Sequence, residues 1–248
     1  MQTDVSRTEA DYFDSLIAER GEFNPFAERG WTTLGKRFAE FIDLPRPVDL
    51  LDIGCGTGQS RSIYIEHCRH YAGVDLSASA IELARRKFPQ SQWLVGDATK
   101  LPFPDESFDV VAFSSVLHHI PDFLPALKEA SRVLRAGGRV FAFDPNLLHP
   151  AMALFRWPKS PLYNPKGVSP NESPLMPGHL RHAFEAAGLV DLRQRCQADI
   201  PYRSVAPKLI NAMLGIYNAG DWLMARSGLD RIFGTFIITC GRKAGGTR

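Results

Sequence analysis

Short apolar runs alternate with helical patterns through the first two thirds of the chain. In the run 48–53, four of the six residues are apolar, which is typical of a short, largely buried strand. Similar runs predict further strands near 71–75, 92–95, 108–113 and 138–143. Helical spacing lies between these strands, near 58–68, 77–87 and 122–134. Strands that alternate with helices predict an α/β fold built on a parallel sheet.

The two ends of the chain extend this pattern. Helical periodicity in 11–20 and 31–42 predicts an N-terminal helical arm over 1–45, in which Tyr12 and Trp31 are the side chains expected to reach a ligand. An arm that only covers one sheet face is the alternative. A helix over 177–187 and strands near 189–198 and 233–240 follow the core. The length suits a single domain over 1–248.

Three alternating glycines, Gly54, Gly56 and Gly58, come directly after the first strand. Glycine lets the backbone pass close to a ligand, because it has no Cβ and adopts positive φ at no steric cost. The amides at the start of the next helix are then unsatisfied donors. This order of strand, turn and helix predicts a nucleotide-type binding loop. The spacing differs from the dinucleotide pattern G-x-G-x-x-G, and no Lys-Ser/Thr pair completes a phosphate-binding P-loop.

The second strand ends in Asp75, 17 residues after Gly58, and its carboxylate is suited to accept both ribose hydroxyls. The motif D-I-G-C-G-T-G followed by G-V-D-L-S resembles the class I, Rossmann-like S-adenosylmethionine methyltransferases, in their small-molecule branch. The resemblance covers roughly 46–146, the expected cofactor-binding core. It implies a seven-stranded, mostly parallel sheet with helices on both faces. It also implies S-adenosyl-L-methionine as the cofactor.

Three further segments carry the same resemblance: 95–98, 108–120 and 134–141. Ala136 stands where the family has proline in the turn before strand five. By this resemblance the glycine loop with Cys55 admits the methionine portion, and Asp52 holds its ammonium directly or through water. Asp75 would bind the ribose, with Leu76 against the adenine. The remaining implied cofactor-binding residues are Asp97, which would accept from the adenine amine, Ala98, which would offer a backbone donor, and Ser114.

His118 and His119 follow the fourth strand, at the carboxyl edge of the sheet where open α/β folds bind ligands. Histidine is suited to remove a proton near neutral pH, so these two are the candidate catalytic residues. In the family, histidines here often serve packing or loop order, and that interpretation is favoured. An amine acceptor needs no base. No metal-ligand cluster is evident.

Two lid-like insertions, 147–176 and 201–231, follow the fifth and sixth strands. Both are rich in apolar and aromatic residues and poor in clustered charge, which suits a small apolar or lipid-like acceptor. Trp157, Tyr163 and Tyr217 are the side chains expected to contact it. The apolar spacing of Leu209, Ile210, Met213, Leu214 and Tyr217 predicts one face of a helix. Ordinary core packing is the alternative, and a contact with a membrane surface stays open.

The amino-acid composition limits the kinds of partner that the protein is expected to bind. Lys plus Arg number 29 against 27 Asp plus Glu, a net charge of +2, which does not favour a nucleic-acid partner. The four cysteines show no paired or zinc spacing, and no apolar run is long enough to span a membrane. We therefore expect a cytoplasmic protein. The oligomeric state stays open.

The predicted function is S-adenosylmethionine-dependent methyl transfer to the O, N or C atom of a small acceptor. Two other classes are weighed against it. A non-catalytic protein would keep the cofactor pocket without turnover, and formation of S-adenosylhomocysteine separates it from an enzyme. A dinucleotide-dependent oxidoreductase is disfavoured by the glycine spacing, and titration with NADH against S-adenosylmethionine separates that class.

Overall fold

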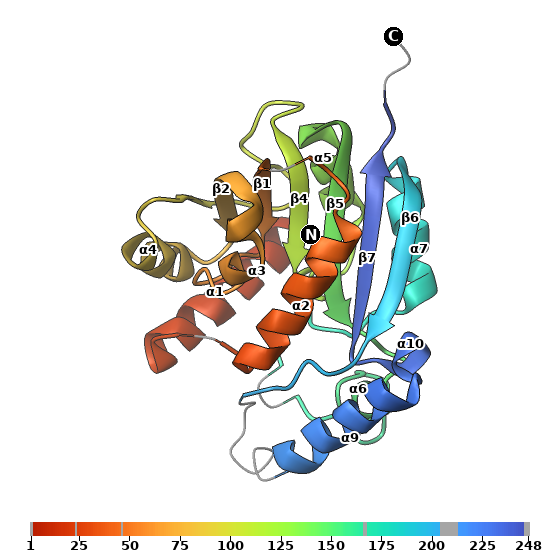
Figure 1. The fold of residues 1–248 in the computed structure, drawn as a ribbon. Coiled ribbons are helices and arrows are strands. Elements are labelled where there is room, and N and C mark those ends of the chain that lie inside the picture. Colours follow the sequence, from red (N-terminus) through yellow and green to blue (C-terminus); the bar gives the residue numbers. More distant parts are fainter. Residues whose placement is uncertain (1, 23, 46, 166–167, 204–212, 246–248) are drawn as a thin grey trace.

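The computed structural model describes residues 2–22, 24–45, 47–165, 168–203 and 213–245. At its centre is a seven-stranded sheet in the order β3-β2-β1-β4-β5-β7-β6 (Figure 1). The strands are β1 (Val48–Ile53), β2 (Cys68–Asp75), β3 (Gln92–Val95), β4 (Phe108–Ser114), β5 (Leu134–Pro145), β6 (Leu189–Gln197) and β7 (Phe236–Lys243). Strands β1 to β5 pair in parallel, and β7 runs antiparallel to both β5 and β6. The predicted α/β fold with a mostly parallel sheet is confirmed.

Helices cover both faces of this sheet, so the side chains of the central strands are buried on both sides. Leu51 and Val111 pack on one face with α5 and α7, whereas Leu50 and Val110 pack on the other with α2 and α4. The helices are α1 (Gln2–Arg20), α2 (Glu28–Phe41), α3 (Arg61–Tyr64), η1 (Ile65–His67), α4 (Ala78–Lys87), η2 (Leu117–His119), α5 (Leu124–Val133), α6 (Pro150–Phe155), α7 (Pro177–Ala186), α9 (Leu214–Ser227) and α10 (Asp230–Phe233).

Several predicted boundaries are wrong, among them the start of β5, which is Leu134 rather than a residue near 138. The helix expected over 58–68 is only α3 and η1, because the turn conformation continues from the glycines to Ser60 and β2 begins at Cys68. The last strand begins at Phe236 rather than at 233, because the preceding residues form α10. The first helix begins at Gln2, well before the expected residue 11.

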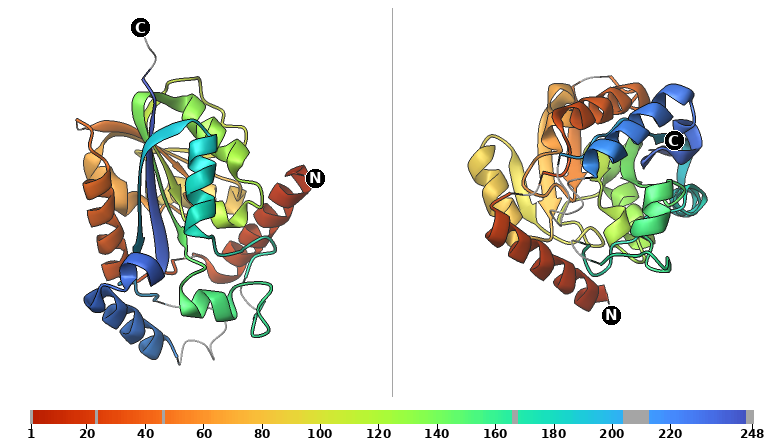
Figure 2. Two further views of the ribbon diagram at one scale, coloured as in Figure 1. Left: turned by 90° about the vertical axis from the view of Figure 1, so that its right-hand side faces the viewer. Right: turned by 90° about the horizontal axis from the view of Figure 1, so that it is seen from below.

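Helices from three distant parts of the chain gather at one end of the sheet. In Figure 1, α1, α6 and α9 lie beyond the lower ends of the strands, where the parallel strands have their carboxyl ends. Seen from below in Figure 2, α1 runs along one edge of this end, and α9 lies on the opposite side. The insertion 147–176 supplies α6, and the described part of 201–231 supplies α9 and α10. The predicted apolar face at Leu209 and Ile210 lies outside the described residues.

Within the described residues, no helix is long and apolar enough to cross a membrane.

Candidate active site at the carboxyl edge of the sheet

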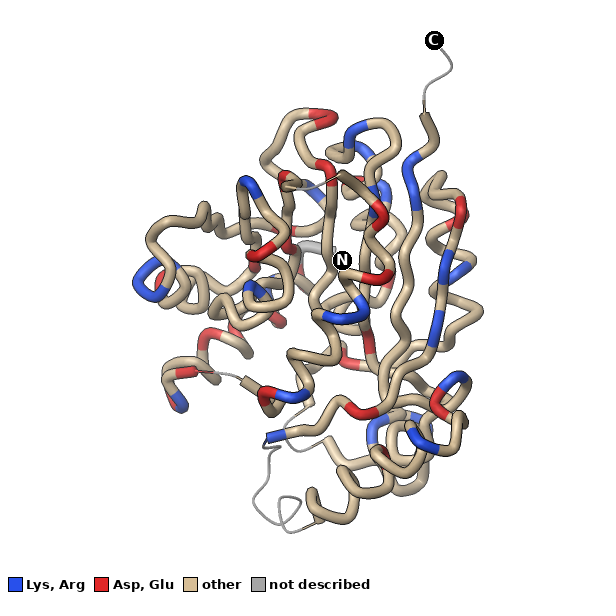
Figure 3. Tube along the Cα trace, viewed as in Figure 1, with Lys and Arg blue, Asp and Glu red and all other residues tan. Residues whose placement is uncertain are grey.

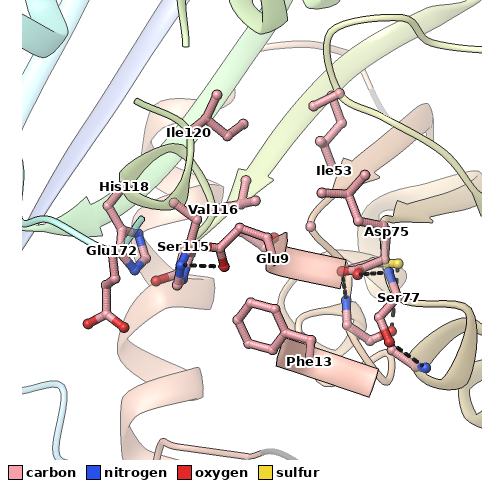
Figure 4. A pocket seen from close by; sticks show the side chains of 18 of the residues that line it. Glu9, Phe13, Ile53, Asp75, Ser77, Ser115, Val116, His118, Ile120 and Glu172 are labelled. Atoms are coloured by element: carbon pink, nitrogen blue, oxygen red, sulfur yellow. Dashed lines mark hydrogen bonds and ion pairs between the residues drawn. The ribbon is translucent and has the colours of Figure 1, made fainter. Parts of the chain in front are cut away.

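A cavity of about 480 Å³ opens at the carboxyl ends of the parallel strands. Its walls come from the loops after β1, β2, β3 and β4 and from helices α1 and α6. Figure 4 shows the side chains from α1 and from the ends of β1, β2 and β4. This volume lies within the range of small-molecule sites, about 300–1,000 Å³. The cavity therefore sits where a doubly wound sheet binds its ligand.

The glycine loop forms one wall of the cavity. Gly54 and Gly56 line the cavity with φ values of +71° and +50°, a conformation that side chains rarely adopt. A Cβ at Gly56 would meet no atom within 4 Å, so the loop leaves open space there. Cys55 also lines the wall. Gly58 differs, because a Cβ there would come 2.9 Å from the ring of Phe88, and it does not line the cavity.

Asp75 ends β2 beside this loop. Its Oδ2 accepts a hydrogen bond from the Gly56 amide at 2.8 Å, and its Oδ1 accepts from the Ser77 amide at 2.9 Å. Burial raises the pKa of this carboxyl above its ordinary value, and the two amide donors oppose that rise. Each carboxylate oxygen can accept further hydrogen bonds. Leu76, the next residue, also lines the cavity.

Asp97 and Ala98 line the cavity after β3. The Asp97 Oδ1 accepts from the amide and the hydroxyl of Thr99, both at 2.8 Å. Its Oδ2 accepts from the hydroxyl of Ser6 on α1 at 2.7 Å. The carboxylate expected to meet the adenine amine is thus already bonded to the N-terminal helix.

Asp52 is fully buried beneath the loop and does not line the cavity. Three hydroxyls donate to its carboxylate: Ser60 at 2.5 Å, Tyr71 at 2.7 Å, and Ser114. Burial raises the pKa of Asp52 to about 6, against the lowering effect of these donors. Direct contact of Asp52 with a ligand is therefore not available in this arrangement. Ser114, which also bonds the Tyr64 hydroxyl at 2.9 Å, does line the cavity.

The residues present fit S-adenosylmethionine. Thr57 lines the cavity next to Gly56, and its buried Oγ1 has no hydrogen-bond partner among the described residues. A buried hydroxyl without a partner is rare, so it indicates a polar ligand group at this position. The glycine loop leaves space for the methionine portion, and Asp75 presents acceptors for a ribose. Thr57 and Ser77 were not predicted to line the site, because short polar residues in turns have no distinctive spacing.

Helix α1 closes the cavity from the side opposite the sheet. Glu9 binds the loop after α6 through its Oε1, which accepts from the Ser169 hydroxyl at 3.0 Å and the Asn171 amide at 2.9 Å. Asp14 binds the start of α4, where its Oδ1 accepts from the Ser77 hydroxyl at 2.5 Å and the Ser79 amide at 3.1 Å. Tyr12 and Trp31, expected to reach the site, both line the cavity.

His118 and His119 both line the cavity, and each is bonded to a different neighbour. The His118 Nδ1 lies 2.9 Å from Asp144 Oδ1, which also accepts from the His118 amide at 3.1 Å. The His119 Nδ1 lies 2.7 Å from the Ser169 hydroxyl. Burial lowers the pKa of His119 well below 6.5, and the neighbouring His118 adds to that effect, so its ring is neutral at pH 7.

The insertions contribute different side chains from those expected. Trp157, Tyr163 and Tyr217 do not line the cavity. Tyr217 instead donates to Thr235 Oγ1 at 3.3 Å and packs against Tyr202. Among the described residues of the insertions, those that line the cavity are Met152, Arg156, Glu172, Pro174 and Tyr202. Apolar spacing alone could not separate the wall of the cavity from the core beside it.

The cavity wall that the insertions supply also carries an ion pair. Arg156 Nη2 lies 3.1 Å from Glu172 Oε1, and both residues line the cavity. Burial is the main reason that the pKa of Tyr12 is raised; the charge of Glu172 adds to the rise and that of Arg156 opposes it. The cavity thus combines apolar walls with a few polar groups, as small-molecule sites commonly do.

Comparison with known proteins gives the same class. Residues 51–142 match a family model described as a methyltransferase domain. A demethylmenaquinone methyltransferase of Paenarthrobacter aurescens (strain TC1) is 30% identical over 148 residues, which cover 59% of this chain and 58% of that relative. The chain spans about half the length of the curated relatives it matches, with 58%, 48% and 51% for the first three.

Solved structures share the fold over nearly the whole chain. An S-adenosylmethionine-dependent methyltransferase from Thermotoga maritima has a TM-score of 0.61 at 20% identity, covering 95% of this chain and 99% of its own. The cyclase SpnF has a TM-score of 0.65 at 18% identity, covering 98% and 97%.

Four features define a class I, Rossmann-like fold for binding S-adenosylmethionine. They are the order of the strands in the sheet, the antiparallel last strand, the glycine loop and the acid at the end of β2. Over residues 51–142 the chain matches a methyltransferase domain, and the order of its strands is that of the class I, Rossmann-like fold.

Proposed function

We propose that this protein transfers the methyl group of S-adenosylmethionine to a small, apolar or lipid-like acceptor at an O, N or C atom. The observation that carries the proposal is one cavity that is lined both by the glycine loop with its neighbouring acids and by many apolar side chains. The acids are Asp75 and Asp97, and His119 and the Arg156–Glu172 pair line the same cavity. Because the relatives are named for a demethylated quinone, a quinol ring is the first acceptor to test.

In this proposal the protein mainly aligns the two reactants and excludes water. S-adenosylmethionine supplies an activated sulfonium methyl, so orientation accounts for much of the rate. Asp75 would accept the ribose hydroxyls and the loop at Gly56 would leave room for the methionine portion. Helix α1 would keep water out, because its apolar side chains Phe13 and Leu16 line the cavity.

A carbon or oxygen acceptor must lose a proton as it gains the methyl group, and we assign that proton to His119. The Ser169 hydroxyl gives its hydrogen to the Glu9 carboxylate, so its oxygen must accept a hydrogen bond from His119 Nδ1–H. This tautomer leaves His119 Nε2 with a free lone pair. The acceptor then forms a new bond to the methyl carbon, the sulfur–methyl bond breaks, and Nε2 takes the proton.

The test is turnover with S-adenosylmethionine whose methyl group carries deuterium. The enzyme is incubated with a reduced demethylated naphthoquinone, a set of apolar phenols and a set of amines, and products are identified by mass spectrometry. We expect S-adenosylhomocysteine together with a labelled, organic-soluble product. Tight cofactor binding without any S-adenosylhomocysteine would instead support a non-catalytic binding protein, and binding of NADH in its place would support an oxidoreductase.

The partner in this proposal is a small molecule, and peripheral contact with a membrane follows if that molecule is a lipid. The absence of a nucleic-acid partner and a cytoplasmic location stay predictions from the sequence. The single-domain division into an arm over 1–45, a core over 46–146 and a C-terminal half over 147–248 is part of the same proposal.

A further inference from the structure

The C-terminal insertions expose an unusual number of large apolar side chains at the cavity end of the molecule. Ile216 is 73% exposed, Leu223 59% and Leu154 46%. The other exposed apolar side chains of α6, α9, α10 and their flanks are Phe155, Trp157, Leu162, Met213, Trp222, Leu229, Ile232 and Phe233. We name the exposed apolar residues of 154–162 and 213–233 the apolar face. Exposed apolar patches commonly mark surfaces that bind another protein or a membrane.

Helix α9 buries an acid while it exposes large apolar side chains, which is unusual for a surface helix. Its buried Asp221 accepts from the amides of Asp199 and Ile200, at 2.7 and 3.2 Å, and from the Thr235 hydroxyl. Ile216 and Leu223 are seven residues apart, so they project from the same side of the helix. The acid thus fixes the helix to the body of the protein while its apolar side chains stay outside.

The charges around the apolar face have one sign. Across 150–165 and 213–233 the exposed charged residues are Lys159, Arg226 and Arg231, whereas the acids in the same segments, Asp221 and Asp230, are 2% and 3% exposed. Figure 3 shows α9 largely without charge. The Arg226 guanidinium lies 4.8 Å from the ring centre of Trp222. Apolar side chains bordered by Arg, Lys and Trp are typical of helices that lie on anionic bilayers.

Helix α6 joins the apolar face to the cavity. Met152 is buried and lines the cavity, while Leu154 and Phe155 on the same helix are exposed on the apolar face. Figures 1 and 2 both place α6 and α9 at the same end of the molecule. An apolar acceptor dissolved in a bilayer would therefore reach the cavity across a single helix.

We propose that the apolar face docks the protein on the surface of an anionic lipid bilayer, from which the acceptor enters along α6. We choose an anionic bilayer because the exposed charged residues around the apolar face are all positive and because Trp157 and Trp222 are exposed there. The proposal takes the lipid-like nature of the acceptor from the proposed function, but the binding itself needs no acceptor and no turnover.

Flotation of the full chain with vesicles tests this directly. Phosphatidylglycerol–phosphatidylcholine vesicles should bind the protein at least tenfold more tightly than pure phosphatidylcholine vesicles, and added salt should weaken the binding. The double variant Ile216→Glu/Leu223→Glu should lose at least tenfold in vesicle affinity. Lys159→Gln/Arg231→Gln should remove most of the preference for anionic lipid without abolishing binding.

The matched control is Val190→Glu, because Val190 is an exposed apolar residue, 38% exposed, on β6. It should bind vesicles as the unchanged protein does. Affinity for S-adenosylmethionine, measured by calorimetry, should be equal in all variants and shows that each is folded.

The proposal is overturned if the unchanged protein does not bind anionic vesicles, or if the double variant binds them equally well. It is also overturned if the unchanged protein is a dimer that the double variant dissociates, since a second copy would then cover the face. Methyl transfer to a water-soluble phenol would be unaffected by any of these results, so the proposed function is judged separately.

Discussion

Replacing Gly56 with alanine isolates the contribution of the glycine loop to cofactor binding. The backbone of Gly56 has φ +50°, and its missing Cβ would project into open space at the wall of the cavity. In the Gly56→Ala variant a methyl group would occupy space that the methionine portion needs. The Gly56 amide also donates to Asp75 at 2.8 Å, so any shift of the loop would disturb the ribose acceptor as well.

The size of the effect separates into two parts. A non-glycine residue with positive φ costs about 1–2 kcal/mol, and the lower entropy of the unfolded chain offsets about 0.4–1 kcal/mol of this. We therefore expect the free energy of unfolding to fall by roughly 1 kcal/mol. Steric overlap should weaken S-adenosylmethionine binding at least tenfold, which corresponds to about 1.4 kcal/mol.

Gly137→Ala is the matched control. Gly137 has φ +80°, a Cβ there would also meet no atom within 4 Å, and the residue does not line the cavity. It should lose a similar amount of stability in urea unfolding while keeping its affinity in calorimetry. Unchanged affinity in folded Gly56→Ala, or an equal loss of affinity in Gly137→Ala, would refute the assignment of the loop to the cofactor.

Three further predictions concern the base, the buried acid and the ion pair. His119→Gln should keep cofactor affinity and lose turnover by about 10² on an oxygen or carbon acceptor, with Ser169→Ala losing less; equal losses on an amine acceptor would argue against a base. Because burial raises the pKa of Asp52 from 3.8 to about 6, the folded protein binds more protons than the unfolded chain between these values. The free energy of unfolding should therefore fall as pH rises through this window, by roughly 3 kcal/mol, and urea titrations of Asp52→Asn should lack this fall. Arg156→Ala should raise KM for the acceptor, since it leaves Glu172 unpaired in the cavity, and a change confined to cofactor affinity would contradict its proposed place beside the acceptor.

The strands and the cofactor loop could be predicted because their signals are local. A buried parallel strand is a short apolar run, and the glycines that follow β1 and the acid that ends β2 have a fixed order in this class. Asp75, Asp97 and Gly56 accordingly lie on one cavity. Local patterns could not tell that Asp52 is sealed beneath the loop by three hydroxyls, because that depends on Tyr71 and Ser114 from neighbouring strands.

Contacts between distant segments could not be predicted from the sequence. Glu9 meets Ser169 across 160 positions, and Ser6 meets Asp97 across 91. Nothing in the polar spacing of the first residues indicates such partners. Apolar and aromatic residues of the insertions were equally ambiguous: Tyr217 is partly buried against Tyr202, Met152 lines the cavity, and other side chains are exposed.

The central claim is that one cavity brings S-adenosylmethionine and an apolar acceptor together for methyl transfer. The most direct measurement is a reaction with the deuterated methyl donor and a reduced demethylated naphthoquinone presented in anionic vesicles, read by mass spectrometry of both phases. The account predicts equal amounts of S-adenosylhomocysteine in water and of singly labelled methylated product in the lipid. Cofactor binding with no S-adenosylhomocysteine, from this acceptor or from any apolar phenol or amine, would contradict it.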